Sequence, residues 1–146
     1  ATELRQLVVE LGLESRVTFT GFRRDLPRLF EALDIVCVPS SNEAFGLTVI
    51  EAMAAGKAVV GSDSGAIPEL LDAETGRLAA PDEPAAWAET MAELAADAVR
   101  RTTMGKAAQR RVEEMFTLSA HVARLVEEYG VPSTGKTTTP RNHGNY

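Results

Sequence analysis

The sequence predicts an α/β domain with a parallel β-sheet, and two observations lead to this fold class. Short apolar runs that suit buried strands alternate with segments whose apolar residues recur at helical spacing. After Pro81 the pattern is helical as far as about residue 130. Strands that alternate with helices imply a layered architecture, in which ligands bind beyond the carboxyl ends of the strands.

The first third of the chain predicts two helices and two strands. A helix is expected over residues 2–13 and a short strand over residues 17–20, which Gly21 closes. Asp25 is the expected cap of a second helix. The apolar run within residues 34–39 predicts a fully buried strand.

The middle of the chain continues the alternation. A helix is expected over about residues 46–55, a buried strand over residues 58–61, and then a loop and a short helix that ends near Leu71. A last short strand is expected over residues 75–80. Three amphipathic helices follow, and the composition of residues 131–146, rich in Pro, Thr, Gly and Asn, predicts a disordered tail.

Composition and charge exclude several classes of function. The net charge is −6, which argues against a nucleic-acid-binding surface, and no apolar run approaches the roughly 18 residues that a membrane span needs. The single cysteine, Cys37, lies in an apolar run and fits a reducing, cytoplasmic compartment. There is no D-x-D sequence and no cluster with metal-ligand spacing, so no metal or other cofactor is expected.

Two carboxylates flank the predicted turn from strand to helix at about residue 46. Glu43 falls in the loop and Glu51 eight residues later in the helix. Amides at a helix start attract anions, and carboxylates accept hydrogen bonds from sugar hydroxyls, so the segment suits a phosphorylated sugar ligand. A charge at Glu51, inside an apolar helix, also costs energy unless it is satisfied. Spacing alone leaves a plain alternative, in which Glu43 complements the helix start and Glu51 points to solvent.

An ordered set of short motifs resembles the C-terminal, donor-binding domain of a GT-B glycosyltransferase of the retaining family 4 type (glycosyltransferases group 1). The resemblance covers roughly residues 3–130, which it identifies as a partial donor-binding domain with a Rossmann-like sheet, and the helical end over residues 100–116 takes part in it. The matching stretches are residues 17–21, 38–43, 45–47, 51–56, 65–69 and 75–78.

The resemblance implies a role for each matched residue. Glu43 would face the donor sugar and serve catalysis, and Glu51 would hold the ribose hydroxyls. Gly21 and Phe22 would lie at the base pocket. The amides that would meet the diphosphate and sugar are those of Phe45, Gly46, Leu47 and Thr48.

The resemblance also implies what this chain would lack. The first two strands of the family pattern, a basic pair that neutralises the diphosphate, and the N-terminal acceptor domain are expected upstream of residue 1. The chain alone is therefore expected to be a fragment, or to pack in a rearranged or partner-assisted way, because the strand at residues 17–20 loses its neighbour. Acceptor sugar or lipid would bind through the missing domain, and peripheral association with the inner face of the membrane is compatible with the family.

Two interpretations of the function differ in class. The first is a transferase domain that binds a nucleoside-diphosphate sugar for retaining glycosyl transfer but does not catalyse as an isolated chain. The second is a non-catalytic nucleotide-sugar-binding or regulatory module derived from the same fold. Asp63 and Ser64 follow a strand end, where they either line the site or cap the loop.

Overall fold

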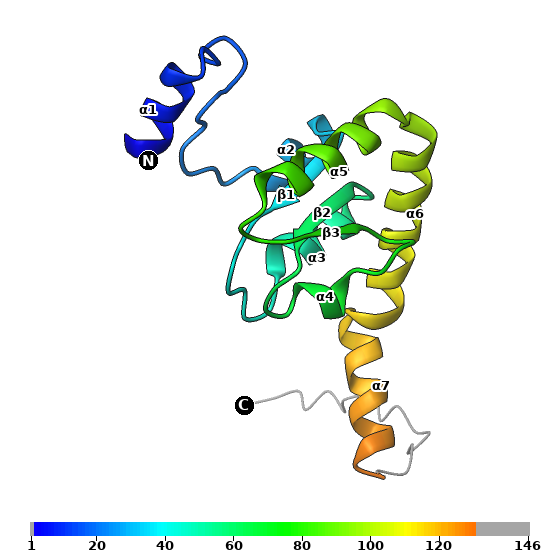
Figure 1. The fold of residues 1–146 in the computed structure, drawn as a ribbon. Helices are drawn as coiled ribbons and strands as arrows, with labels where there is room; N and C mark the ends of the chain where they lie inside the picture. The colour runs from blue at the N-terminus through cyan, green and yellow to red at the C-terminus, as the bar shows by residue number, and fades with distance from the viewer. Residues whose placement is uncertain (1, 131–146) are drawn as a thin grey trace, which may run out of the picture. The chain divides into compact units, whose positions relative to one another are not determined.

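The structure is a computed structural model that describes residues 2–130, and the predicted tail at residues 131–146 lies outside this range. The chain divides into a first unit, residues 1–32, and a second unit, residues 33–146. Each unit is described by itself (Figure 1).

The first unit contains two helices, α1 (Thr2–Glu10) and α2 (Leu26–Ala32). The predicted strand at residues 17–20 is wrong, because this segment pairs with no strand in the described part of the chain. A β-strand is defined by its ladder of hydrogen bonds, and an apolar β-branched sequence without a partner does not form one.

The second unit is built on a parallel three-stranded sheet, which confirms the predicted fold class. Its strands are β1 (Ile35–Val38), β2 (Ala58–Ser62) and β3 (Arg77–Ala79), in the order β1-β2-β3. Val38 is paired with Gly61, and Gly61 with Leu78, so the carboxyl ends of all three strands meet at one edge. The site predicted from the sequence follows two of these strand ends.

The described part of the second unit also contains five helices. They are α3 (Leu47–Ala54), α4 (Ile67–Leu70), α5 (Pro84–Ala96), α6 (Ala98–Met115) and α7 (Leu118–Glu128). Figure 1 shows α5 on one side of the sheet and α3 and α4 on the other. Leu94 of α5 and Met104 of α6 pack with Val60 of β2 in one part of the core, and Gly61 faces Ile67 of α4.

Strand β1 is less buried than its apolar sequence predicts. Val36 and Val38 are buried, but Ile35 and Cys37 are only half-buried. The reason is position, since β1 lies at the edge of the described sheet while β2, buried at every residue, lies at its centre. Burial nevertheless raises the pKa of the Cys37 thiol.

Helix α6 lies against α3 because Gly105 lets the two backbones approach closely. A Cβ atom at Gly105 would lie 2.7 Å from the carbonyl carbon of Gly56, and closer still to its oxygen. Gly56 follows α3 with a φ of 68°, the left-handed conformation that glycine adopts without strain. Two glycines on segments far apart in the sequence therefore fix how α6 sits on α3.

A second anchor joins α6 to the turn before β3. Arg111 Nη1 donates to Asp72 Oδ2 at 2.8 Å, and Arg111 Nη2 donates to the Glu69 carbonyl oxygen at 3.2 Å. Asp72 Oδ1 also accepts hydrogen bonds from Thr75 Oγ1 and from the amides of Glu74 and Thr75. Partial burial would raise the pKa of Asp72, but these hydrogen bonds and the charge of Arg111 together lower it.

The contact at Gly105 predicts a large effect of a single methyl group. We expect Gly105→Ala to lower the free energy of unfolding by about 1–2 kcal/mol, because overpacking typically costs about 1–3 kcal/mol while the helix preference of alanine over glycine recovers about 1 kcal/mol. Urea denaturation followed by circular dichroism measures this change. Thr103→Ala, at an exposed position of the same helix, is the matched control. A Gly105→Ala variant as stable as the unmodified chain would contradict the close approach of the two backbones.

The anchor at Asp72 predicts a dependence of stability on pH. Because the folded-state pKa lies below the ordinary value of 3.8, the stabilisation is complete above that value and is lost as pH falls through the folded pKa. Asp72→Ala should lower the free energy of unfolding by about 1 kcal/mol at pH 7, a figure discounted for the half-exposed carboxylate. The difference in unfolding free energy between the variant and the unmodified chain should shrink toward pH 2. A difference that does not depend on pH would refute the stabilising role of the ionised Asp72 carboxylate. Asp82→Ala, at an exposed turn, serves as the control.

Candidate functional site

Two loops lie side by side at the carboxyl edge of the sheet. The Glu43 loop, residues 39–46, follows β1, and the Gly65 loop, residues 63–66, follows β2. Because β1 and β2 are paired in register, both loops leave the sheet at the same level. The Ala66 amide donates to the Glu43 carbonyl oxygen at 2.9 Å, which joins the loops directly.

Glu43 folds back onto the amides of its own loop. Its Oε1 atom accepts hydrogen bonds from the Gly46 amide at 3.1 Å and from the Phe45 amide at 3.5 Å. In the described part of the chain, no hydrogen bond uses Glu43 Oε2. One oxygen of the carboxylate is thus held by the backbone, and the other is open to a ligand.

Gly46 makes this fold of the loop possible. It is the N-cap of α3 and has a φ of 80°, a conformation that L side chains rarely adopt. A Cβ atom there would lie 2.5 Å from Leu70 Cδ1, so the position also lacks space for a side chain. The positive φ is therefore the reason for glycine at this tight turn, and a Cβ atom would also require the Leu70 side chain to move.

The first amides of α3 are open to solvent. No described residue accepts a hydrogen bond from the amides of Leu47 or Thr48, and both residues are exposed. Helix N-terminal amides carry partial positive charge and bind anions when they are accessible. Of the four amides expected to face the ligand, two are directed at Glu43 and two remain open.

Glu51 lies on the exposed side of α3, one turn after Thr48 and Leu47. The expectation that its charge would be costly inside an apolar helix is wrong, because the buried face of α3 is formed by Val49, Ala52 and Met53 instead. Its carboxylate forms no hydrogen bond or ion pair with residues 2–130. The exposed face of α3 thus presents the Leu47 and Thr48 amides and the Glu51 carboxylate in succession.

Gly21 and Phe22, the residues expected at the base pocket, belong to the first unit. Gly21 has a φ of 67°, and Phe22 is 89% exposed. A single exposed aromatic side chain is common on protein surfaces and does not by itself indicate a binding site. The role of both residues stays a prediction.

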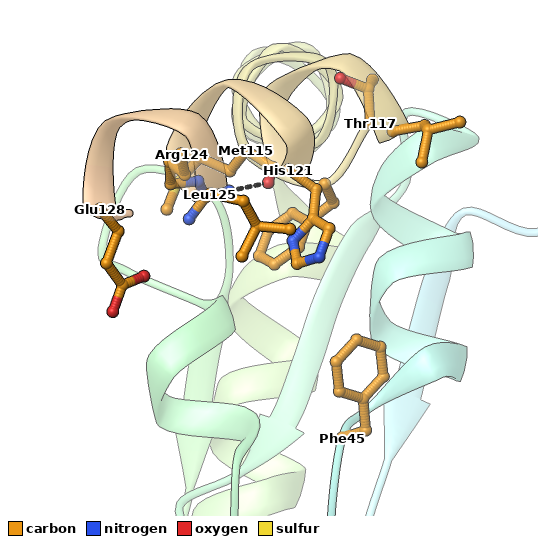
Figure 2. Close-up of a pocket in the computed structure, with 9 residues that line it drawn as sticks. Phe45, Met115, Thr117, His121, Arg124, Leu125 and Glu128 are labelled. Carbon is orange, nitrogen blue, oxygen red and sulfur yellow. Dashed lines mark hydrogen bonds between the residues drawn. The ribbon is translucent and has the colours of Figure 1, made fainter. Parts of the chain in front are cut away.

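The Phe45 side chain lines a cavity, whereas the Phe45 amide donates to the Glu43 carboxylate. The ring borders a cavity of about 710 Å³ whose other walls come from the end of α6 and from α7 (Figure 2). In the same region Arg124 donates a hydrogen bond to the Met115 carbonyl oxygen. The lining residues are Phe45, Met115, Phe116, Thr117, Leu118, His121, Arg124, Leu125 and Glu128.

Sequence analysis missed two features of this region. Arg111 of α6 donates a hydrogen bond to the Glu69 carbonyl oxygen in α4, the helix that follows the Gly65 loop. Ser64, for which lining the site and capping a loop were both open, bonds to the Glu43 loop. Neither contact has a signal in one sequence, because each joins segments that are distant along the chain.

Residues 2–130 contain neither a candidate metal site nor a candidate membrane span. No three His, Cys, Asp or Glu side chains are grouped in a way that would hold a metal ion. No helix in the same range is long and apolar enough to span a membrane.

Comparison with known proteins gives consistent matches. The family model described as glycosyl transferases group 1 matches residues 1–97. The D-inositol 3-phosphate glycosyltransferase of Corynebacterium efficiens is 37% identical over 135 residues, covering 90% of this chain and 32% of the relative. The enzyme of the same name from Mycolicibacterium gilvum is 44% identical over 133 residues, covering 87% of this chain and 29% of the relative.

Solved structures give the same result for the fold. The crystal structure of HepE from Anabaena in complex with UDP matches with a TM-score of 0.82 and 34% identity, covering 88% of this chain and 36% of that chain. Sucrose-phosphate synthase from Thermosynechococcus elongatus matches with a TM-score of 0.80 and 33% identity. The match covers 88% of this chain and 33% of the synthase chain. The chain spans about a third of the length of these four relatives. It belongs to the glycosyl transferases group 1 family and has the α/β fold of GT-B glycosyltransferases.

Proposed function

We propose that this chain is the donor-binding part of a retaining glycosyltransferase and binds a nucleoside-diphosphate sugar at the carboxyl edge of its sheet. The observation that carries the proposal is the exposed face of α3, where two open amides adjoin the Glu51 carboxylate and follow the Glu43 loop. Solved relatives of the same fold hold UDP or UDP-glucose, which supports this class of ligand.

The geometry suggests a division of labour among the site residues. The amides of Leu47 and Thr48 would bind the diphosphate, because they are open and lie at the positive end of α3. Glu51, one turn further along, would accept hydrogen bonds from the ribose hydroxyls. Glu43 would present its open Oε2 atom to the sugar hydroxyls while the Phe45 and Gly46 amides hold Oε1. Gly21 and Phe22 would meet the base.

The proposed chemistry depends on charge that develops in the leaving group. When the glycosidic bond to phosphate breaks, the diphosphate gains negative charge, and preorganised amides stabilise it more than the ground state. The amides of Leu47 and Thr48 would supply part of this stabilisation. Arg111 of α6 is already held by the Asp72 carboxylate and by the Glu69 carbonyl oxygen.

Two consequences follow for the isolated chain. It should bind donor weakly, because only part of the diphosphate charge is met, and it should not transfer the sugar. Acceptor binding is proposed to lie in those parts of such proteins that this chain, at about a third of its relatives' length, does not cover.

Binding of nucleotides tests the proposal directly. Isothermal titration of the 146-residue chain with UDP, GDP and ADP should show a preferred base, and Glu51→Ala should weaken that interaction about 10- to 100-fold. The expected size follows from the roughly 1.5–3 kcal/mol of a hydrogen bond to a charged group. Glu114→Ala, which removes an exposed carboxylate from α6, should leave the affinity unchanged.

Two outcomes would count against the proposal. Equal affinities of the Glu51→Ala variant and the unmodified chain would remove Glu51 from the site. A chain that binds none of the three nucleotides at millimolar concentration would refute the donor-binding function itself.

A further inference from the structure

The Glu43 loop carries its carboxylate on a backbone that the Gly65 loop holds in three ways. Ser64 Oγ donates to the Ser41 carbonyl oxygen at 2.6 Å. The Ala66 amide donates to the Glu43 carbonyl oxygen at 2.9 Å. Between them, Gly65 packs its Cα against the Glu43 peptide. These contacts join residues that are more than twenty positions apart in the sequence.

Gly65 leaves no room for any other residue. A Cβ atom at this position would lie 2.9 Å from the Glu43 amide nitrogen and closer still to the Glu43 carbonyl oxygen. The obstruction is backbone, which cannot rotate away as a flexible side chain can. Gly65 also has a φ of 60°, in the left-handed region. The Glu43 peptide is thus fixed against a surface that tolerates only glycine.

The Glu43 side chain depends on this support. Its Oε1 atom reaches the Gly46 amide at 3.1 Å only while the peptide of Glu43 keeps its place relative to the start of α3. The loop itself is half-buried to exposed at every residue except Gly46, so side-chain packing contributes little to its order. Hydrogen bonds from outside the loop are then the main restraint on the direction of the carboxylate.

We infer that the Gly65 loop is a positioning element for Glu43, with Ser64 and Gly65 as its positioning residues. It sets the direction of the open Oε2 atom, and it therefore determines how well the site distinguishes a nucleoside-diphosphate sugar from the bare nucleoside diphosphate. This part of the inference rests on the proposed function. The restraint of Glu43 by Ser64 and Gly65 does not.

Amide hydrogen exchange in the 146-residue chain tests the restraint without any ligand. Ser64→Ala should speed exchange of the Gly46 and Ala66 amides about tenfold relative to the unmodified chain, and Ser64→Thr, which keeps the hydroxyl, should restore most of the protection. The amides of Val60 in β2 and Ala108 in α6 should be unchanged. Unchanged exchange at Gly46 in Ser64→Ala would overturn the inference.

A pair of glycine variants separates the contact from simple backbone strain. Gly65→Ala and Gly12→Ala both place alanine at a positive φ, 60° and 64°, but a Cβ atom at Gly12 meets nothing within 4 Å. Only Gly65→Ala should speed exchange at Gly46. If both variants speed it equally, strain and not the contact with Glu43 is responsible, and the inference is wrong.

The ligand readout is the ratio of the affinities for UDP-glucose and UDP. Ser64→Ala should lower this ratio about fivefold or more and leave UDP affinity within twofold, because the diphosphate amides of Leu47 and Thr48 lie outside the contact. If the unmodified chain binds UDP-glucose and the ratio does not change in the variant, the specificity role fails. If the unmodified chain binds neither compound, the proposed function and that role fail together, while the exchange data still decide whether Ser64 and Gly65 restrain Glu43.

Discussion

The contact between Gly65 and the Glu43 peptide is the constraint on which the site depends. It follows from the parallel pairing of β1 with β2, since only neighbouring strands deliver their next loops to the same place on the sheet edge. Gly46 then turns the chain into α3, and the open amides of that helix lie beside the loop that carries Glu43. Sheet pairing, two glycines and a helix start thus produce a site without any buried charge.

The sequence left open an alternative in which the two carboxylates have no binding role, and the structure agrees with both of its geometric features. Glu43 does complement the start of α3, because it accepts hydrogen bonds from the Phe45 and Gly46 amides, and Glu51 does face solvent. Neither fact argues against binding. A carboxylate held by one oxygen is oriented in advance, and an exposed carboxylate next to open helix amides is available to hydroxyl groups without first breaking an internal bond.

Much of the fold was predictable from sequence, and the failures have physical causes. The strands at β1, β2 and β3 and the helices that follow them have strong periodic or apolar patterns, which local sequence determines. Residues 17–20 have the same β-branched character but no partner strand in the described chain, and pairing is not a local property. The sequence left the exposure of Glu51 open because the helix is apolar around most of its circumference, so the orientation of the helix depends on its contacts with α6 and β2. The contacts of Ser64 and Arg111 join distant segments, and a single sequence carries no signal for them.

The central claim is that the exposed face of α3 and the Glu43 loop form one site for a nucleoside-diphosphate sugar. Mapping chemical-shift changes of backbone amides as UDP-glucose is added to the labelled chain tests it most directly. The account predicts that the largest changes fall on Leu47, Thr48, Glu51 and Gly46, with little change in α5. Saturable changes confined to other surfaces, such as the cavity between Phe45 and α7 or the helix α5, would contradict it.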